Sequence, residues 1–291
     1  MSATTVSPLI GRWNLVFQTP TEPLPGWLEV HKSGHSTLVG RFVGTHGSAR
    51  PIAVVKVEGD DFTFAIPPQW ESGDQDLIVH GWIKGDGLVG TIQFPDGRSC
   101  NWTGVRSPSL RPAAPPAWGE TVTLFNGVDL GGWQVIQGAE TWTVVDGILT
   151  NPTRGGNLVT DARFGDFKLH AEFRYPPNGN SGIYLRGRYE VQIVDSPQEE
   201  PATDLIGAIY GFLEPSAIVT NGPDAWNSYD ITLVGRMVTI ELNGRTVIAN
   251  QAIPGTTGGA LDSDESAPGP IMLQGDHGPI EYRNIVLTPA V

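Results

Sequence analysis

The chain contains 291 residues, of which 39% are hydrophobic, and its 37 glycines and 24 prolines favour frequent turns over long helices. The formal net charge of −13, from 18 basic and 31 acidic residues, disfavours binding to nucleic acids and to anionic membrane surfaces. No stretch stays apolar for the length of a transmembrane span, so no membrane partner is expected. Cys100 is the only cysteine, which excludes an intramolecular disulfide.

The N-terminal segment Met1–Leu9 has no basic stretch followed by an apolar one, so it does not resemble a secretory signal. We therefore expect a cytoplasmic protein as the sequence stands, and a periplasmic one if a signal has been removed. The sequence does not indicate an oligomeric state.

Residues 1–107 consist of short β-type runs separated by turn residues such as Lys84-Gly85-Asp86-Gly87. Their regular spacing predicts an antiparallel meander that closes into a small β-barrel. The motif Gly11-Arg12-Trp13 is similar to that of lipocalin-like barrels, in which the tryptophan plugs one end. The expected strands are Ile10–Phe17, Gly26–His31, Thr37–Val43, Pro51–Glu58, Asp61–Ala65, Leu77–Lys84, Gly87–Phe94 and Ser99–Val105.

Residues 108–118 form a proline-rich segment, and proline density disfavours sheet pairing. We interpret this segment as a linker between a barrel domain at 1–107 and a second domain at 119–291, since both lengths suit single domains. The role of the barrel is left open between a lid, a dimerisation surface and an independent binding domain.

Residues 119–291 are also predicted to be all-β, and the pairs Asp146-Gly147 and Asn243-Gly244 are typical of hairpin turns. About eleven strands without a long helix predict a concanavalin-like jelly-roll sandwich of two sheets. The expected strands are Trp142–Val145, Ile148–Asn151, Asn157–Thr160, Phe167–Tyr175, Gly182–Arg186, Tyr189–Val194, Trp226–Val234, Met237–Leu242, Arg245–Asn250, Ile271–Gln274 and Ile280–Leu287.

Two consecutive runs, Ile183–Arg186 and Tyr189–Val194, place Arg186, Glu190 and Gln192 among alternating apolar residues. Side chains alternate between the faces of a strand, so Glu190 and Gln192 share one face. A solvated sheet surface with an ordinary ion pair explains this pattern about as well as a groove for a polar ligand.

The run Phe167–Arg174 alternates in the same way, with His170 and Glu172 on its polar face. If this run pairs with Ile183–Arg186 and Tyr189–Val194, the polar faces of the three strands coincide in one groove of carboxylates, cations and amides. For His170, an ordinary solvated histidine is the simpler interpretation.

The loop Gly275-Asp276-His277-Gly278 lies between two β-type runs and exposes a histidine next to an acid. His277 could serve as a general base or as a metal ligand, while Asp276 could be an ordinary turn former. No compact metal-ligand spacing occurs, and no strand carries the paired carboxylates of retaining glycosidases.

Nine sequence blocks, in order, resemble the 3-keto-disaccharide hydrolase-like domain family over residues 124–287, and this family has a concanavalin-like sandwich fold. They include Leu124-Phe125-Asn126-Gly127, Asp146-Gly147-Ile148-Leu149, Asn180-Ser181-Gly182-Ile183-Tyr184, Tyr189-Glu190-Val191-Gln192-Ile193, Gly207-Ala208-Ile209-Tyr210-Gly211, Trp226-Asn227-Ser228-Tyr229 and Gln274-Gly275-Asp276-His277-Gly278. The barrel residues 1–107 lie outside this resemblance.

The resemblance implies an enzyme that cleaves 3-keto-glycosides by removing the C2 proton and eliminating the aglycone, with hydrolysis or lyase products. It implies His277 or Glu172 as base, Arg186 at the oxyanion and Glu190 as acid. Substrate-binding roles fall to Gln192, Asp195, Gln274, Trp226, Tyr184 and His170.

A divalent cation (Ca, Mg or Mn) held by Glu172, Glu190 and His277 would polarise the keto group. The expected partner is a small carbohydrate, with anomer and linkage undetermined. The alternatives are a carbohydrate-binding protein without catalysis and an ordinary endo-glycosidase, which the missing carboxylate pair disfavours.

Overall fold

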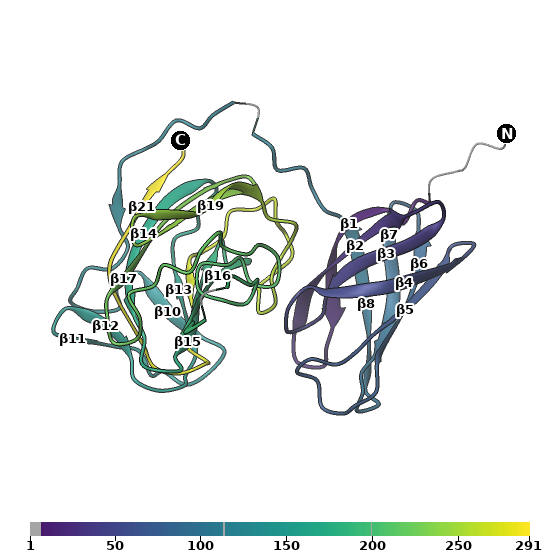
Figure 1. Ribbon diagram of the computed structural model, residues 1–291, viewed down its shortest axis with the longest axis horizontal. Helices are drawn as coiled ribbons and strands as arrows, with labels where there is room; N and C mark the ends of the chain where they lie inside the picture. The colour runs from purple at the N-terminus through teal and green to yellow at the C-terminus, as the bar shows by residue number, and fades with distance from the viewer. Residues whose placement is uncertain (1–6, 113, 199) are drawn as a thin grey trace. The chain divides into compact units, whose positions relative to one another are not determined.

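The computed structural model describes residues 7–112, 114–198 and 200–291. All regular structure in these residues is β-strand, which confirms the predicted all-β class (Figure 1). None of them forms a helix of the length and apolar character needed to cross a membrane. The chain divides into two compact units, Met1–Pro108 with Gly255–Glu265, and Ser109–Pro254 with Ser266–Val291.

The first unit is a closed barrel in which each strand pairs with the next and β1 pairs with β8. Trp13 is buried, and the guanidinium carbon of Arg106 lies 3.7 Å from its ring centroid. Apolar side chains fill the interior, where Phe17 and Phe64 each contact Phe42 edge-on. The strands are β1 Gly11–Gln18, β2 Pro23–Ser33, β3 Thr37–Val43, β4 Arg50–Glu58, β5 Asp61–Ile66, β6 Leu77–Lys84, β7 Gly87–Gln93 and β8 Ser99–Arg106.

The second unit is a sandwich of a five-stranded sheet, ordered β10-β13-β20-β15-β16, and an eight-stranded sheet that contains β11-β12-β21-β14-β17-β18-β19 with β9 paired to β21. The strands of the first sheet are β10 Trp133–Ile136, β13 Asn157–Thr160, β15 Asn180–Leu185, β16 Tyr189–Val194 and β20 Met272–Leu273. Those of the second are β9 Val122–Thr123, β11 Thr143–Val145, β12 Ile148–Asn151, β14 Phe167–Arg174, β17 Asn227–Val234, β18 Met237–Leu242, β19 Arg245–Ala252 and β21 Ile280–Pro289.

Alternate side chains of the two sheets meet in a shared core, and the remaining ones project outward. Ser181 of β15 lies 3.0 Å from the hydroxyl of Tyr282 on β21, and Tyr229 of β17 donates to the Gln192 carbonyl at 2.6 Å. Each sheet therefore has one outward face, and these two faces lie on opposite sides of the sandwich.

Two-residue turns set the registers of the hairpins. Asp146-Gly147 and Asn243-Gly244 have positive φ at both residues, as a type I′ turn requires, and they join β11 to β12 and β18 to β19. Between β15 and β16 the turn has three residues, Arg186–Arg188, with positive φ at Arg186 and Gly187, and it leaves Tyr184 opposite Glu190.

One expected pairing is wrong. Strand β14 pairs with β17 and β21, with Glu172 opposite Ser228 and Arg283, and it does not pair with β15 or β16. The groove expected from coinciding polar faces is therefore not formed. Alternation in a strand specifies that one face is outward, but it does not specify the sheet to which the strand belongs.

Candidate active site

The outward face of the five-stranded sheet gathers buried polar side chains from three strand segments. Cross-strand pairing places Gln192 opposite Gly182, and Glu190 opposite Tyr184. Tyr184 is also opposite Met272 on β20, so Gln274, two residues later, follows on the same side. Glu190, Gln192 and Gln274 are 4%, 5% and 8% exposed, which is unusual for polar residues on the outward side of a sheet.

Gly182 makes room for the Glu190 side chain. A Cβ atom at residue 182 would lie 2.6 Å from Glu190 Oε1 and 2.9 Å from its Cγ. The carboxyl group therefore lies directly over the glycine backbone, and any other residue at position 182 would displace it.

Burial raises the pKa of Glu190 from 4.5 to about 8. The hydrogen bond from the Tyr184 hydroxyl opposes this shift, and the negative charge of Asp276 reinforces it. Burial also raises the pKa of Tyr184 well above its usual value, so its hydroxyl keeps its proton. At neutral pH Glu190 is mostly a neutral carboxylic acid, which can donate a proton.

The loop after β20 carries a histidine paired with a carboxylate. His277 Nδ1 lies 2.7 Å from Asp276 Oδ1. Burial opposes ionisation of Asp276, but the hydrogen bond and charge of His277, together with the charge of Arg154, hold its pKa below the usual range. With Nδ1 facing Asp276, the other ring nitrogen, Nε2, has no hydrogen-bond partner among the described residues and is directed away from this carboxylate.

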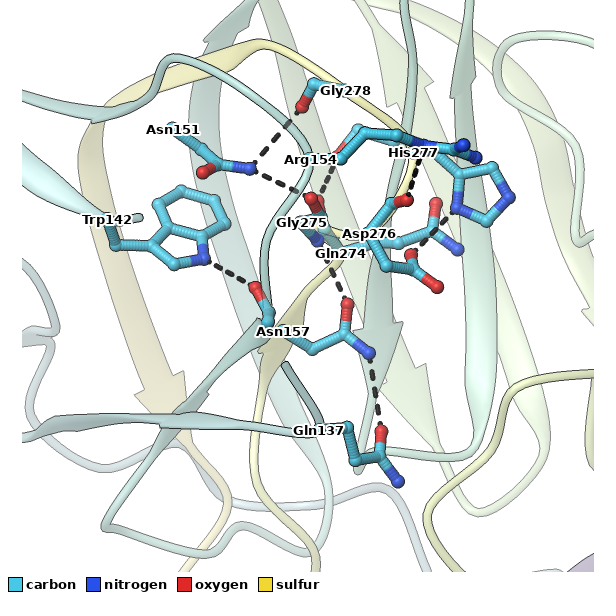
Figure 2. Close-up of polar contacts among 12 residues, drawn as sticks. Gln137, Trp142, Asn151, Arg154, Asn157, Gln274, Gly275, Asp276, His277 and Gly278 are labelled. Atoms are coloured by element: carbon cyan, nitrogen blue, oxygen red, sulfur yellow. Dashed lines mark hydrogen bonds and ion pairs between the residues drawn. The ribbon is translucent and has the colours of Figure 1, made fainter. Parts of the chain in front are cut away.

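A frame of buried asparagines fixes this loop, as Figure 2 shows. Asn151 donates to the Gly275 carbonyl at 2.9 Å and to that of Gly278 at 3.4 Å. Asn157 accepts from the Gly275 N–H at 2.9 Å, and Arg154 donates to the Asp276 carbonyl at 3.0 Å. The backbone on both sides of His277 is therefore held by side chains from β12, β13 and the loop that joins them.

Gly275 is required at the centre of the frame. A Cβ atom there would lie 2.2 Å from the Gly156 carbonyl oxygen and 2.8 Å from Trp142 Nε1, which donates to that same carbonyl. Thr141 completes the frame by donating to Asn151 Oδ1 at 2.5 Å.

Glu172 lies on the outward face of the other sheet, and so do two residues expected to bind substrate. Arg283 Nε and Asn284 Nδ2 donate to its two carboxylate oxygens at 2.6 and 2.5 Å. His170 pairs with Asp230 at 2.8 Å on this face. Arg283 and Arg174 both lie over the indole of Trp226. The structure therefore does not bring Glu172, His170 and Trp226 together with Glu190.

Two further predicted residues take part in other contacts. The Arg186 side chain donates to the Gly235 carbonyl, in the turn between β17 and β18, at 2.5 Å, and it lies near the core-facing ring of Tyr189. Asp195 accepts from the Asn178 N–H at 2.9 Å and so stabilises the turn before β15. Neither contact involves the outward face that carries Glu190.

The expected metal triad is not assembled, because Glu172 and Glu190 occupy opposite outward faces. Within the described ranges, no group of three or more His, Cys, Asp or Glu side chains is arranged to hold a metal ion. The residues present do not fit the cation site expected from the sequence.

Sequence reasoning missed the supporting residues of this site. Asn151 and Asn157 could have been recognised from the sequence as residues with a specific role. Asparagine is depleted in strands, and a buried asparagine in a strand needs a specific hydrogen-bond partner. Tyr210 donates its N–H to the Glu190 carbonyl at 3.1 Å, and it lies in the glycine-flanked block Gly207–Gly211. That block was recognised only as part of the family resemblance.

Comparison with known proteins locates similarity in the second unit. Residues 120–288 match the family described as the 3-keto-alpha-glucoside-1,2-lyase-like domain. A crystal structure from Parabacteroides distasonis ATCC 8503, described as a "putative glycosyl hydrolase", is 32% identical and aligns with 62% of this chain and 94% of its own, with a TM-score of 0.51. A second structure from that organism with the same description is 20% identical, aligned over 59% of this chain and 94% of its own, with a TM-score of 0.48. No protein with a curated description matches this chain.

Proposed function

The chain belongs to the 3-keto-alpha-glucoside-1,2-lyase-like domain family through residues 120–288, and from this premise we propose that it cleaves the glycosidic bond of 3-keto-glycosides. The family and its glycosyl hydrolase relative support a glycoside-active enzyme in general. The keto sugar as substrate is our proposal, and it is supported by the combination of groups on the Glu190 face.

The proposed reaction is a β-elimination. A ketone at C3 acidifies the C2–H bond, so a base can take that proton and leave an enolate. The electron pair then forms the C1–C2 double bond as the C1–O bond breaks, and an acid protonates the departing aglycone oxygen. The product is an enone, and later addition of water at C1 makes the net reaction a hydrolysis.

One observation carries the assignment of roles: a neutral Glu190 lies near an ionised Asp276 that holds His277. Asp276 orients the imidazole, so Nε2 presents a lone pair that can accept the C2 proton. Glu190, protonated at neutral pH, donates its proton to the aglycone oxygen. In enzymes, the general acid and the general base are typically found where neighbouring ionisable groups have their pKa values shifted in opposite directions by their surroundings.

The enolate oxygen needs a positive group, and Arg154 replaces the expected Arg186 in this role. Its Nε donates to the Asp276 carbonyl, which places the guanidinium beside His277. The terminal nitrogens of an arginine engaged only through Nε can donate to a developing oxyanion. No step is assigned to a metal ion.

The test compares methyl 3-keto-glucoside with methyl glucoside in D₂O. We expect methanol release and an enone absorbance from the keto sugar alone. The enone has no hydrogen at C2, so deuterium should appear at C2 only in the 3-keto-glucose formed when water adds to it. Equal cleavage of both sugars, or cleavage of the keto sugar with full retention of the C2 proton, would contradict the proposal. Added chelator tests separately for a divalent cation.

A further inference from the structure

Three buried amide oxygens on the Glu190 face have no hydrogen-bond partner. They are Asn180 Oδ1, Gln192 Oε1 and Gln274 Oε1, and within the described part of the chain no other side-chain amide oxygen is in this condition. The Gln192 and Gln274 side chains are more than nine-tenths buried, with 5% and 8% of their surface exposed. Buried acceptors are rarely left unpaired in native proteins, because their desolvation is not compensated.

These oxygens surround one position of the sheet. Gln192 lies opposite Gly182, and the Gln274 N–H donates to the Gly182 carbonyl at 2.9 Å. Asn180 is two residues from Gly182 on β15, so its side chain projects on the same side. The acceptors therefore gather around a residue without a side chain, next to the carboxyl group of Glu190.

The three unpaired oxygens limit which chemical groups a ligand can place on this face. Carbonyl oxygens accept hydrogen bonds and cannot donate them, so they are satisfied by O–H or N–H groups of a ligand. Asp276 follows Gln274 by two residues and has a lowered pKa, so it places a negative charge close to this face that disfavours a second carboxylate. A 3-keto-hexopyranoside has three remaining hydroxyl groups, at C2, C4 and C6, and no charge.

We infer that Asn180, Gln192 and Gln274 form a subsite that accepts hydrogen bonds from the hydroxyl groups of a neutral hexopyranose ring and discriminates against deoxy sugars and uronates. The inference rests on the proposed function for the identity of the sugar, and it adds the feature by which the site recognises that sugar. A site that hydrogen-bonds a hydroxyl group rejects an analogue lacking it, because the buried acceptor is then left unpaired.

The test uses Gln192→Met and Gln274→Met, which keep the length of the side chain and remove the acceptor. Binding of methyl glucoside and its 4-deoxy, 6-deoxy and uronate forms is measured by calorimetry, and kcat/KM is measured on the 3-keto forms. For the unaltered chain we expect each deoxy sugar and the uronate to bind at least about tenfold more weakly. Each methionine variant should lose affinity for the parent sugar and also lose its discrimination against one deoxy sugar.

Gln134→Met is the matched control, since Gln134 is exposed on the same sheet and already donates to Asp161 at 3.0 Å. This control should bind and discriminate like the unaltered chain. Equal losses for parent and deoxy sugars in the two site variants, or absence of binding for every neutral glycoside, would overturn the subsite. If binding behaves as expected while no 3-keto sugar is cleaved, the subsite stands and the proposed reaction fails.

Discussion

Glu190 and Glu172 both project from the outward face of a sheet, one on each side of the sandwich, and their surroundings shift their proton affinities in opposite directions. Burial raises the pKa of Glu190 to about 8. Glu172 also experiences desolvation, but hydrogen bonds from Asn284 and Arg283 and the charge of Arg283 lower its pKa. The sequence pattern alone does not distinguish the two glutamates, since each alternates with apolar neighbours in a strand.

The difference lies in the partners that each carboxyl group finds. Glu172 has a guanidinium and an amide on its two oxygens, so it is an ionised member of a surface network. Glu190 has a tyrosine hydroxyl and a neighbouring negative charge, so it retains a proton that it can transfer. The Glu172 side also has a hollow of about 360 Å³, which is lined by Glu172, Trp226 and His170.

The largest expected effect separates the two carboxyl groups by activity. Glu190→Gln keeps the shape of the protonated acid and removes the transferable proton, so kcat/KM on a 3-keto-glycoside should fall by roughly 10²–10⁴-fold. Glu172→Gln should leave kcat/KM close to that of the unaltered chain. The measurement is the initial rate of enone formation at pH 7.

A substrate with a good leaving group sharpens this comparison. A nitrophenolate needs no protonation on departure, so Glu190→Gln should recover most of its rate on nitrophenyl 3-keto-glucoside. If Glu172→Gln loses more activity than Glu190→Gln, the active site belongs on the opposite face of the sandwich.

Much of the fold could be predicted from the sequence because its determinants are local. Apolar alternation gave the strands of the barrel and most of those of the sandwich, and the Asp-Gly and Asn-Gly turns fixed their hairpins. The short strands β9 and β10 were missed, whereas β11 and β12, which are no longer than β10, were predicted because the Asp146-Gly147 turn marks the hairpin between them.

The candidate site was predictable only where its residues lie close in sequence. Glu190, Gln192 and Tyr184 belong to one hairpin, so their common face follows from the register of that hairpin. The assignment of β14 to the opposite sheet depends on pairing with β21, more than a hundred residues later. No local pattern encodes such long-range pairing, so Glu172 was wrongly grouped with Glu190.

An intermediate effect concerns the frame around His277. Asn151→Ala removes the donor to the carbonyls of Gly275 and Gly278, so the imidazole loses its fixed position. We expect kcat/KM to fall roughly tenfold to a hundredfold, mainly through kcat, because small displacements of a catalytic group are costly. The free energy of unfolding should fall by about 1–3 kcal/mol, since buried acceptors lose their partner.

Asn227→Ala is the control for the asparagine frame. Asn227 is equally buried, and it accepts from the Asn221 N–H at 2.8 Å and from Asn243 at 2.9 Å, on the side of the eight-stranded sheet. It should lose a similar amount of stability while its kcat remains unchanged. Equal losses of kcat in both variants would show that Asn151 has only a structural role and does not position His277 for catalysis.

The smallest expected effect is a difference in how stability depends on pH. Glu190 has a pKa of about 8 when folded and about 4.5 when unfolded, so the folded chain binds the extra proton between these values. Its contribution to stability is complete below pH 4.5 and declines as pH rises toward 8, by up to about 1.4 kcal/mol per pH unit.

Glu172 has a lowered pKa, so its contribution is present above pH 4.5 and declines as pH falls below that value. Urea unfolding from pH 3 to pH 9 should therefore show Glu190→Gln flattening the slope above pH 5, and Glu172→Gln changing only the acidic side. Identical slopes above pH 5 for Glu190→Gln and the unaltered chain would show that Glu190 is ionised in the folded protein, and would remove it as the general acid.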